Sequence, residues 1–365
     1  MNHVKITVRQ FAVIVMIFTI GTTILISPSG LAAITKQDAW LAAILGVALS
    51  LLIVCLYNRI SDYFPDMTLV EYNEKVFGKV LGKMFSLFFI LFSFLGAATV
   101  LFHLGNFITT QVMPETPIEA VIIVFAIIVV MGVRLGVETL VRAAEIFFPW
   151  IIMLFTILVV SLLPNIRIEK LQPMFTTGGK SLLKAAISLA GTTSLPLIVL
   201  LMVFPAHVNR YLKAKKAFLL ATLLGGTCFV IITFICISVL GALNTERHMY
   251  PSYALAKQIN IGNFLERVEI LIAGIWFLTV YFKTTFYLYS SVMGLAQLLN
   301  IEDYRPLVMP IGMILVVCSL VIYPNVAYMT EFDTETWVPV ALTIGLMYPL
   351  LILGVAAFRE SMTKN

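Results

Sequence analysis

Charged side chains are scarce in this chain. Lysine, arginine, aspartate and glutamate make up only 12% of its 365 residues, whereas hydrophobic residues make up 60%. A soluble domain is closer to a quarter charged and half apolar, so the composition excludes an ordinary soluble protein. Together with a mean hydropathy of +1.01, it predicts a polytopic membrane protein.

Cysteine is also rare, and no catalytic motif is present. The four cysteines, Cys55, Cys228, Cys236 and Cys318, lie in apolar segments without metal-ligand spacing, so we expect small buried side chains rather than disulfides or a metal site. The sequence has no Walker loop, zincin motif or nucleophile elbow, which gives no support to an enzyme or to a cofactor. In a membrane protein the net charge of +5 reflects topology rather than nucleic-acid binding.

Hydrophobic runs fill most of the chain. A helix needs about 20 apolar residues to cross a bilayer, and by that criterion the sequence predicts an all-α protein with ten transmembrane helices in a single domain, residues 1–365. The first run is longer than the apolar core of a signal peptide, so we expect no cleavage. The expected spans are 11–34, 40–60, 82–112, 118–133, 144–163, 184–206, 216–243, 267–299, 306–323 and 337–358.

Lysine and arginine are distributed unevenly between the linkers. If both termini are cytoplasmic, most of these residues fall in cytoplasmic segments, which is the usual bias of membrane proteins. An even number of spans, divided five plus five, then gives the halves 11–163 and 184–358 opposite orientations. The sequence therefore predicts an inverted repeat of the kind found in secondary transporters.

The first and sixth expected spans are interrupted at matching places by small, polar and proline residues. The first interruption runs from Gly21 to Pro28, and the second from Gly191 to Pro196. A membrane helix tolerates a break only where its freed backbone groups meet protein or a wet cavity. Paired breaks therefore indicate a binding site at the midplane. The alternative for the first interruption is a proline kink within a continuous helix.

Lys283 lies near the middle of the eighth expected span. A lysine at that depth costs roughly 2.5–3.5 kcal/mol on the insertion scale and usually faces a cavity or a partner. Thr279 and Tyr287 lie one turn to either side on the same helical face. We expect Lys283 to pair with a ligand carboxylate, or to hold exposed carbonyls of the first span in place of a coupling cation. A lysine bonded to those carbonyls without any ligand contact is the structural alternative.

The third expected span offers two sets of polar residues. Gly96 and Thr99 lie nearer its middle and are the better candidates to line a pocket, if this span crosses the site. His103 and Asn106, at i and i+3, either present a polar face or bond to a neighbouring helix. For His103 we favour the second interpretation.

Clusters of charge at span ends have structural interpretations. Glu138, Arg142 and Glu145 are spaced i, i+4 and i+7, which is typical of an ion-pair ladder. A basic cluster at 210–216 indicates contact with anionic membrane lipids or, alternatively, docking of a cytoplasmic partner. A solvated outer loop is expected for the acidic residues Glu331, Asp333 and Glu335.

Several short motifs, in order along the chain, resemble those of a known family. They are the interruption Gly21 to Pro28, Gln37-Asp38-Ala39-Trp40, Thr68-Leu69-Val70-Glu71-Tyr72, Pro114-Glu115-Thr116-Pro117, Gly136 to Glu145, Leu171-Gln172-Pro173, Trp276 with Phe282-Lys283, and Asp303-Tyr304-Arg305-Pro306-Leu307. Together they make the chain similar, nearly end to end, to the spore germination permeases. These are the B subunits of nutrient germinant receptors in spore-forming bacteria, within the amino acid–polyamine–organocation transporter superfamily.

The resemblance implies a LeuT-like fold with broken helices one and six, located in the inner membrane of the dormant spore. It also implies a larger A subunit and a lipoprotein C subunit as partners, and a pocket for a small nutrient such as an amino acid or a nucleoside. Lys283 and Tyr287 match pocket-lining positions of the family. The expected ligand-binding residues are Gly21, Thr22, Thr23, Gly96, Thr99, Thr193, Ser194, Leu197, Lys283 and Tyr287.

One departure from the family affects the ligand. Many relatives carry Gly-x-Glu in the sixth span, whereas the comparable residues here are Leu197, Ile198 and Val199. Ligand rules taken from glutamate-bearing relatives therefore do not transfer to this chain. The expected function is nutrient sensing within a receptor, and the alternative is a secondary amino acid transporter coupled to protons or sodium.

Overall fold

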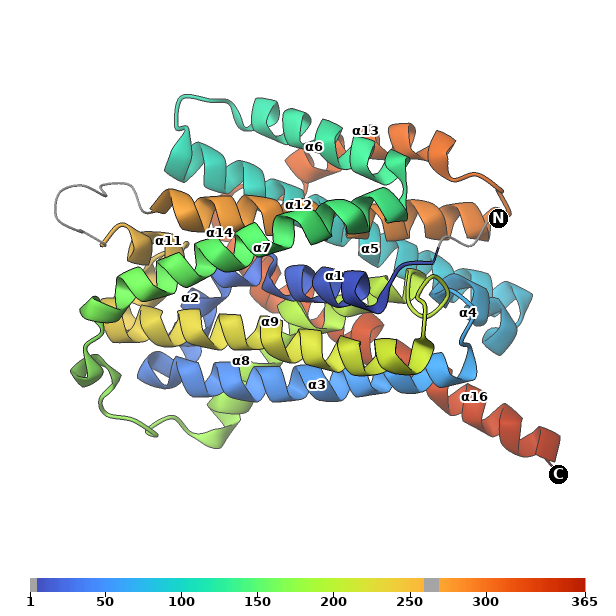
Figure 1. Ribbon diagram of the computed structural model, residues 1–365, viewed down its shortest axis with the longest axis horizontal. Helices are drawn as coiled ribbons and strands as arrows, with labels where there is room; N and C mark the ends of the chain where they lie inside the picture. The colour runs from blue at the N-terminus through green and yellow to red at the C-terminus, as the bar shows by residue number, and fades with distance from the viewer. Residues whose placement is uncertain (1–4, 259–268, 365) are drawn as a thin grey trace.

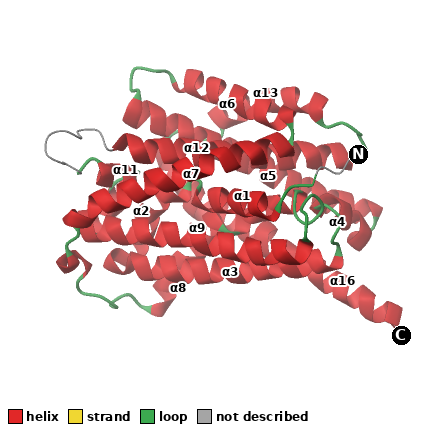
Figure 2. Cartoon of the chain, viewed as in Figure 1, coloured by secondary structure: helices red, strands yellow, loops and turns green. Residues whose placement is uncertain are grey.

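The computed structural model of the protein describes residues 5–258 and 269–364. Within these ranges the chain is a bundle of helices joined by short connections, and no sheet is formed (Figures 1 and 2). Eight helical stretches in the described part of the chain are long and apolar enough to cross a membrane. The predicted all-α, multi-pass membrane architecture is therefore confirmed.

The helices of the first half follow the expected hydrophobic runs. The 61–81 connection, expected to be a linker, contains a further short helix, α4 (Leu69–Phe77), whose first turn is closed by a capping box between Thr68 and Glu71. The longer elements are α1 (Val8–Ile20), α2 (Thr23–Thr35), α3 (Ala39–Tyr63), α5 (Lys79–Phe107), α6 (Ile118–Leu135) and α7 (Val137–Leu162).

The second half contains more short helices than the sequence predicted, because segments expected as linkers are helical. Two of these, α10 (Ala242–Arg247) and α11 (Pro251–Ala256), lie at the start of the 244–266 connection, whose residues 259–266 fall outside the described ranges. The remaining elements of the second half, long and short, are α8 (Gly179–Thr193), the 3₁₀ segment η5 (Leu195–Met202), α9 (Tyr211–Leu240), α12 (Glu269–Leu298), α13 (Arg305–Val321), α14 (Val326–Glu331), the π-turn η6 (Phe332–Thr336), α15 (Trp337–Leu342), the π-turn η7 (Thr343–Met347) and α16 (Tyr348–Lys364).

The interrupted segments lie at the centre of the bundle. Helix α1 packs against α7, α9 and α12, and its last eight residues are all buried. Helix α8 packs against α2 and α3, and α8 with η5 is the most buried of the membrane-length stretches. In Figure 1, α6 and α13 lie along one edge of the bundle and α3 along the opposite edge. Composition does not decide this placement, since the edge helix α6 is more apolar than the central stretch of α8 and η5.

The ion-pair ladder predicted on α7 forms only in part. Arg142 pairs with Glu138 one turn earlier, as expected. Glu145, however, pairs with Arg9, at 3.2 Å from its Nε, and accepts a hydrogen bond from Gln10. The prediction is therefore wrong at Glu145, because the start of α1 packs against α7 and supplies a closer partner than the same helix does.

Candidate ligand-binding site

The first interruption separates α1 from α2 at Gly21 and Thr22. Gly21 is required by a close approach, since a Cβ at this position would lie 2.6 Å from Cδ of Lys283. Its carbonyl accepts a hydrogen bond of 3.3 Å from Thr279 on α12. Thr23 donates to the carbonyls of Thr19 and Ile20, so its hydroxyl closes the end of α1. The break therefore lies directly against α12.

Pro28 lies inside α2 rather than at the break. A proline has no N–H, so the carbonyl of Ile24, four residues earlier, loses its usual helical partner. The hydroxyl of Ser252 on α11 donates to that oxygen at 2.6 Å. The helix continues past Pro28 because a neighbouring segment replaces the missing donor.

The second interruption repeats this arrangement. Helix α8 ends at Thr193 and continues as η5, and Pro196 removes the donor for the carbonyl of Thr192. The ammonium of Lys283 donates to this oxygen at 3.1 Å. The carbonyls of Gly191 and Leu195 accept hydrogen bonds from the side chains of Trp337 and Tyr57, respectively. Side chains from other helices therefore supply donors for the freed carbonyls, as a membrane interior requires.

Lys283 joins the two interruptions. Its Nζ donates to Oγ1 of Thr22 at 3.0 Å as well as to the carbonyl of Thr192, and it lies 5.2 Å from the ring centre of Phe18. The residue is only 2% exposed, and it has no acidic partner among the described residues. An ammonium has three donors, so one remains for another acceptor. A buried charge held only by neutral groups favours an anionic or strongly accepting ligand.

A cavity of about 380 Å³ lies beside Lys283. Four of the expected ligand-binding residues line it: Thr22, Thr99, Lys283 and Tyr287. The hydroxyl of Tyr287 makes no hydrogen bond within the described residues, so it can serve a ligand. The remaining lining residues are Ile26, Ser27, Ser29, Gly30, Leu31, Val100, His103, Ser188, Leu189, Thr192, Glu246, Arg247, His248, Met249, Val326, Met329, Thr330, Asp333, Thr334 and Trp337.

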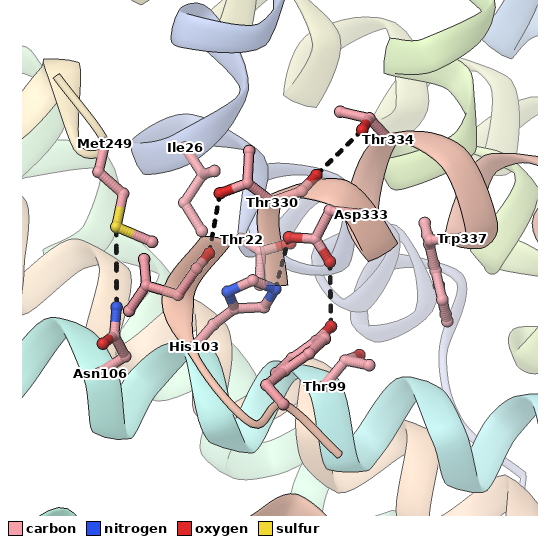
Figure 3. A network of polar contacts seen from close by, with 12 residues as sticks. Thr22, Ile26, Thr99, His103, Asn106, Met249, Thr330, Asp333, Thr334 and Trp337 are labelled. Atoms are coloured by element: carbon pink, nitrogen blue, oxygen red, sulfur yellow. Dashed lines mark hydrogen bonds and ion pairs between the residues drawn. The ribbon is translucent and has the colours of Figure 1, made fainter. Parts of the chain in front are cut away.

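The far wall of the cavity carries a buried polar network. Asp333, on η6, reaches His103 on α5, with 3.1 Å between Nε2 and the carboxylate (Figure 3). The second oxygen of Asp333 accepts a hydrogen bond of 3.0 Å from Tyr323. Asn106, one turn beyond His103, donates to Tyr250 at 2.7 Å. The network therefore connects α5 to the segments that follow α13 and α10.

The segment with Glu331, Asp333 and Glu335 is helical, formed by α14 and η6, so the prediction of a solvated loop is wrong. Glu331 and Glu335 are exposed as expected, but Asp333 is turned inward together with Met329 and Trp337. These three residues are spaced i, i+4 and i+8, which places them on one face of a continuous helical segment. That spacing could have indicated the site, had 326–336 been recognised as helical.

The other expected site residues do not line the cavity. Gly96 makes room for the ring of Tyr287, because a Cβ there would lie 2.5 Å from that ring. Thr193 donates to the carbonyl of Leu189 within α8, and its oxygen lies 3.5 Å from that of Ser50 on α3. Ser194 and Leu197 are fully buried. Because α8 continues through Thr193, its 3.6-residue repeat turns Thr192 rather than Thr193 toward the cavity.

The comparisons with known proteins agree with this architecture. A family model described as "Spore germination protein" matches residues 5–327. Spore germination protein KB of Bacillus subtilis (strain 168) is 28% identical over 366 residues, covering 99% of this chain and 96% of that protein. YfkT of the same organism is 31% identical over 322 residues, covering 87% and 86%, respectively.

Two solved structures share the fold. MhsT in complex with L-phenylalanine gives a TM-score of 0.68 at 16% identity, covering 95% of this chain and 97% of that one. Mhp1, a nucleobase-cation-symport-1 family transporter with bromovinylhydantoin bound, gives 0.70 at 15% identity, covering 96% and 79%. The expected LeuT-like fold is therefore confirmed, while the number of ten crossings stays a prediction. From the family match over most of its length, the chain belongs to the spore germination permease family.

Proposed function

We propose that this chain is the nutrient-sensing membrane subunit of a spore germinant receptor. A small solute such as an amino acid or a nucleoside binds in the cavity beside Lys283. The observation that supports this most directly is the buried ammonium, which bonds to both interrupted segments and keeps one donor for a ligand. Family membership supports the receptor role and a larger A subunit and a lipoprotein C subunit as partners.

In this proposal the nutrient response arises because the ligand lies between α2 and α8, whose relative arrangement can change. A ligand can shift a conformational equilibrium only through its different affinity for the two states. Ligand bonded to Lys283 favours the arrangement in which Thr22 and Thr192 lie within reach of the same ammonium. The resulting preference for one arrangement of α2 and α8 passes to the partner subunits in the spore inner membrane. With both termini cytoplasmic, the cavity faces the outer side.

The test uses spores that carry this receptor as their only germinant receptor. A panel of amino acids, nucleosides and sugars identifies the activating nutrient, and dose–response curves follow for Lys283→Ala and Tyr287→Phe. We expect at least a tenfold rise in the half-maximal concentration, since a lost charge-assisted hydrogen bond costs about 1.5–3 kcal/mol. Protein levels are measured alongside by immunoblot.

A matched tyrosine on the same helix serves as the control. Tyr281 contacts Phe125 on α6 and does not line the cavity, so Tyr281→Phe should leave the response unchanged. Normal dose–response curves for both Lys283→Ala and Tyr287→Phe would exclude the cavity as the nutrient site.

Secondary transport of an amino acid is the second candidate function, and the shared fold with MhsT and Mhp1 favours it. The two functions differ in what the chain does alone. A transporter reconstituted in vesicles accumulates the solute in a saturable way when a proton or sodium gradient is applied, whereas a sensor binds it without accumulation. Saturable, gradient-dependent uptake by the chain without its partners would replace the sensing proposal.

A further inference from the structure

A second cavity, of about 400 Å³, lies on the periphery of the helix bundle, between α6 and α13. These two helices pack together along one edge of the bundle (Figure 1). The floor of the cavity includes two small, buried residues, Ala126 and Gly312. A Cβ on Gly312 would lie 2.3 Å from Cγ2 of Val130. Its rims are formed by Met131 and Met313, which are 59% and 61% exposed. We call this cavity the α6–α13 groove.

The groove is apolar except at one end. Its only charged lining residue is Arg134, in the last turn of α6. Arg134 is exposed and has no ion pair within the described part of the chain. Next to it, Tyr304 donates to the carbonyl of Val133 at 3.2 Å, which fixes the start of α13 at the same end. Tyrosine and arginine together are typical of a helix end at the membrane–water interface.

The length of the groove matches one leaflet of a bilayer. Its α6 lining runs from Ile123 to Arg134, eleven residues apart in sequence, which is about 16 Å along a helix. The hydrocarbon core is about 30 Å thick, so one leaflet is about 15 Å. An acyl chain that begins at the interface beside Arg134 and spans one leaflet is therefore about as long as the groove.

The occupant is identified by the single charge at the end of the groove and by the length of the groove. A single flexible hydrocarbon chain fits, and methionine rims adapt readily to such a chain. The guanidinium at the end matches a phosphate, to which arginine donates paired hydrogen bonds.

We propose that the α6–α13 groove binds one anionic phospholipid, with an acyl chain between the two helices and the headgroup phosphate on Arg134. The site is separate from the cavity beside Lys283, since the two share no lining residue. It gives the permease a lipid that stays with the protein rather than exchanging freely with the bilayer.

The test is native mass spectrometry of the full chain released from vesicles of equal parts phosphatidylglycerol and phosphatidylcholine. The wild-type chain should retain phosphatidylglycerol in preference to phosphatidylcholine. Arg134→Gln should reduce that preference about fivefold, the usual effect of one basic residue at an anionic surface. Arg59→Gln removes another exposed arginine near a helix end, far from the groove in sequence, and should change nothing.

A third variant tests the groove itself. Ile127 is a rim residue that is 54% exposed, so Ile127→Trp can fill the groove without changing the core, and it should reduce lipid retention with Arg134 intact. Unfolding temperatures in detergent confirm that each variant is folded. Equal losses in Arg134→Gln and Arg59→Gln, or full retention in Ile127→Trp, would overturn the proposal. So would unchanged lipid retention in Arg134→Gln.

Discussion

Gly21 and Lys283 depend on each other. The side chain of Lys283 reaches the two interruptions by passing over Gly21, at a distance that leaves no room for a methyl group. Of the two roles expected for the lysine, pairing with a ligand carboxylate stays a prediction. In place of carbonyls of the first interruption, it bonds to the hydroxyl of Thr22 and to the carbonyl of Thr192 in the second interruption. The ammonium thus connects two segments that are distant in sequence.

Gly21→Ala should therefore impair the nutrient response without touching any ligand-bonding group. The added methyl would lie 2.6 Å from Cδ of Lys283 and 2.8 Å from the backbone oxygen of Phe18, which displaces the lysine and strains the end of α1. We expect the half-maximal nutrient concentration to rise about tenfold, the effect of roughly 1.4 kcal/mol. Gly354→Ala is the matched control, because a methyl there meets no atom within 4 Å and the residue does not line the cavity. Equal responses of the two variants would show that the position of Lys283 does not matter.

Asp333 is the residue most clearly missed from the sequence. Its carboxylate bonds to both His103 and Tyr323 at the cavity wall. Asp333→Asn removes the charge while keeping the shape, so it should weaken the contact between α5 and η6 and alter the nutrient dose–response. Glu335→Gln, an exposed neighbour, should leave it unaltered. If germination curves of the two variants coincide, the wall network has no part in sensing.

At the scale of elements, each interruption is stabilised by a donor from a different helix. The clearest case is Pro28, whose missing N–H is replaced by the hydroxyl of Ser252 on α11. Such interhelical hydrogen bonds contribute about 0.6–1.7 kcal/mol within membranes. The two prolines thus make α2 and α8 dependent on contacts that a rearrangement of the bundle would change.

Ser252→Ala should lower the unfolding free energy by about 1 kcal/mol, because it leaves the carbonyl of Ile24 without a donor. Adding Pro28→Ala should restore most of the loss, since the new N–H can bond to that carbonyl within α2. The comparison is made by denaturation in detergent, with Ser319→Ala as control because its hydroxyl bonds only within its own helix. Additive effects of the two substitutions would contradict the pairing.

Hydrophobic length alone predicted most of the elements, and the interruption at Gly21 was visible because glycine and proline are poor residues for a helix interior. The end of α8 was not predictable in the same way. Gly191, Thr192 and Thr193 are weak helix formers, yet packing keeps them helical, and this decides that Thr192 rather than Thr193 lines the cavity. The helix in 326–336 was missed because its acidic residues gave it the composition of a loop.

At the scale of the whole molecule, the fold brings polar groups from both halves of the chain to one cavity. Thr22 and Thr99 come from the first half, and Thr192, Lys283 and Asp333 from the second. A long-range arrangement of this kind depends on the packing of α1 and α8 in the centre of the bundle, which no local pattern specifies. The fold shared with MhsT and Mhp1 accounts for the arrangement.

The central claim is that a nutrient binds beside Lys283, and direct binding to the purified full chain tests it. Thermal unfolding is followed while the nutrient identified in the spore panel is added to wild type, Lys283→Ala and Tyr281→Phe. Saturation at about 100 times the dissociation constant stabilises a protein by about 2.7 kcal/mol. We predict this stabilisation for wild type and Tyr281→Phe and its loss in Lys283→Ala. Equal stabilisation of all three proteins would contradict the account.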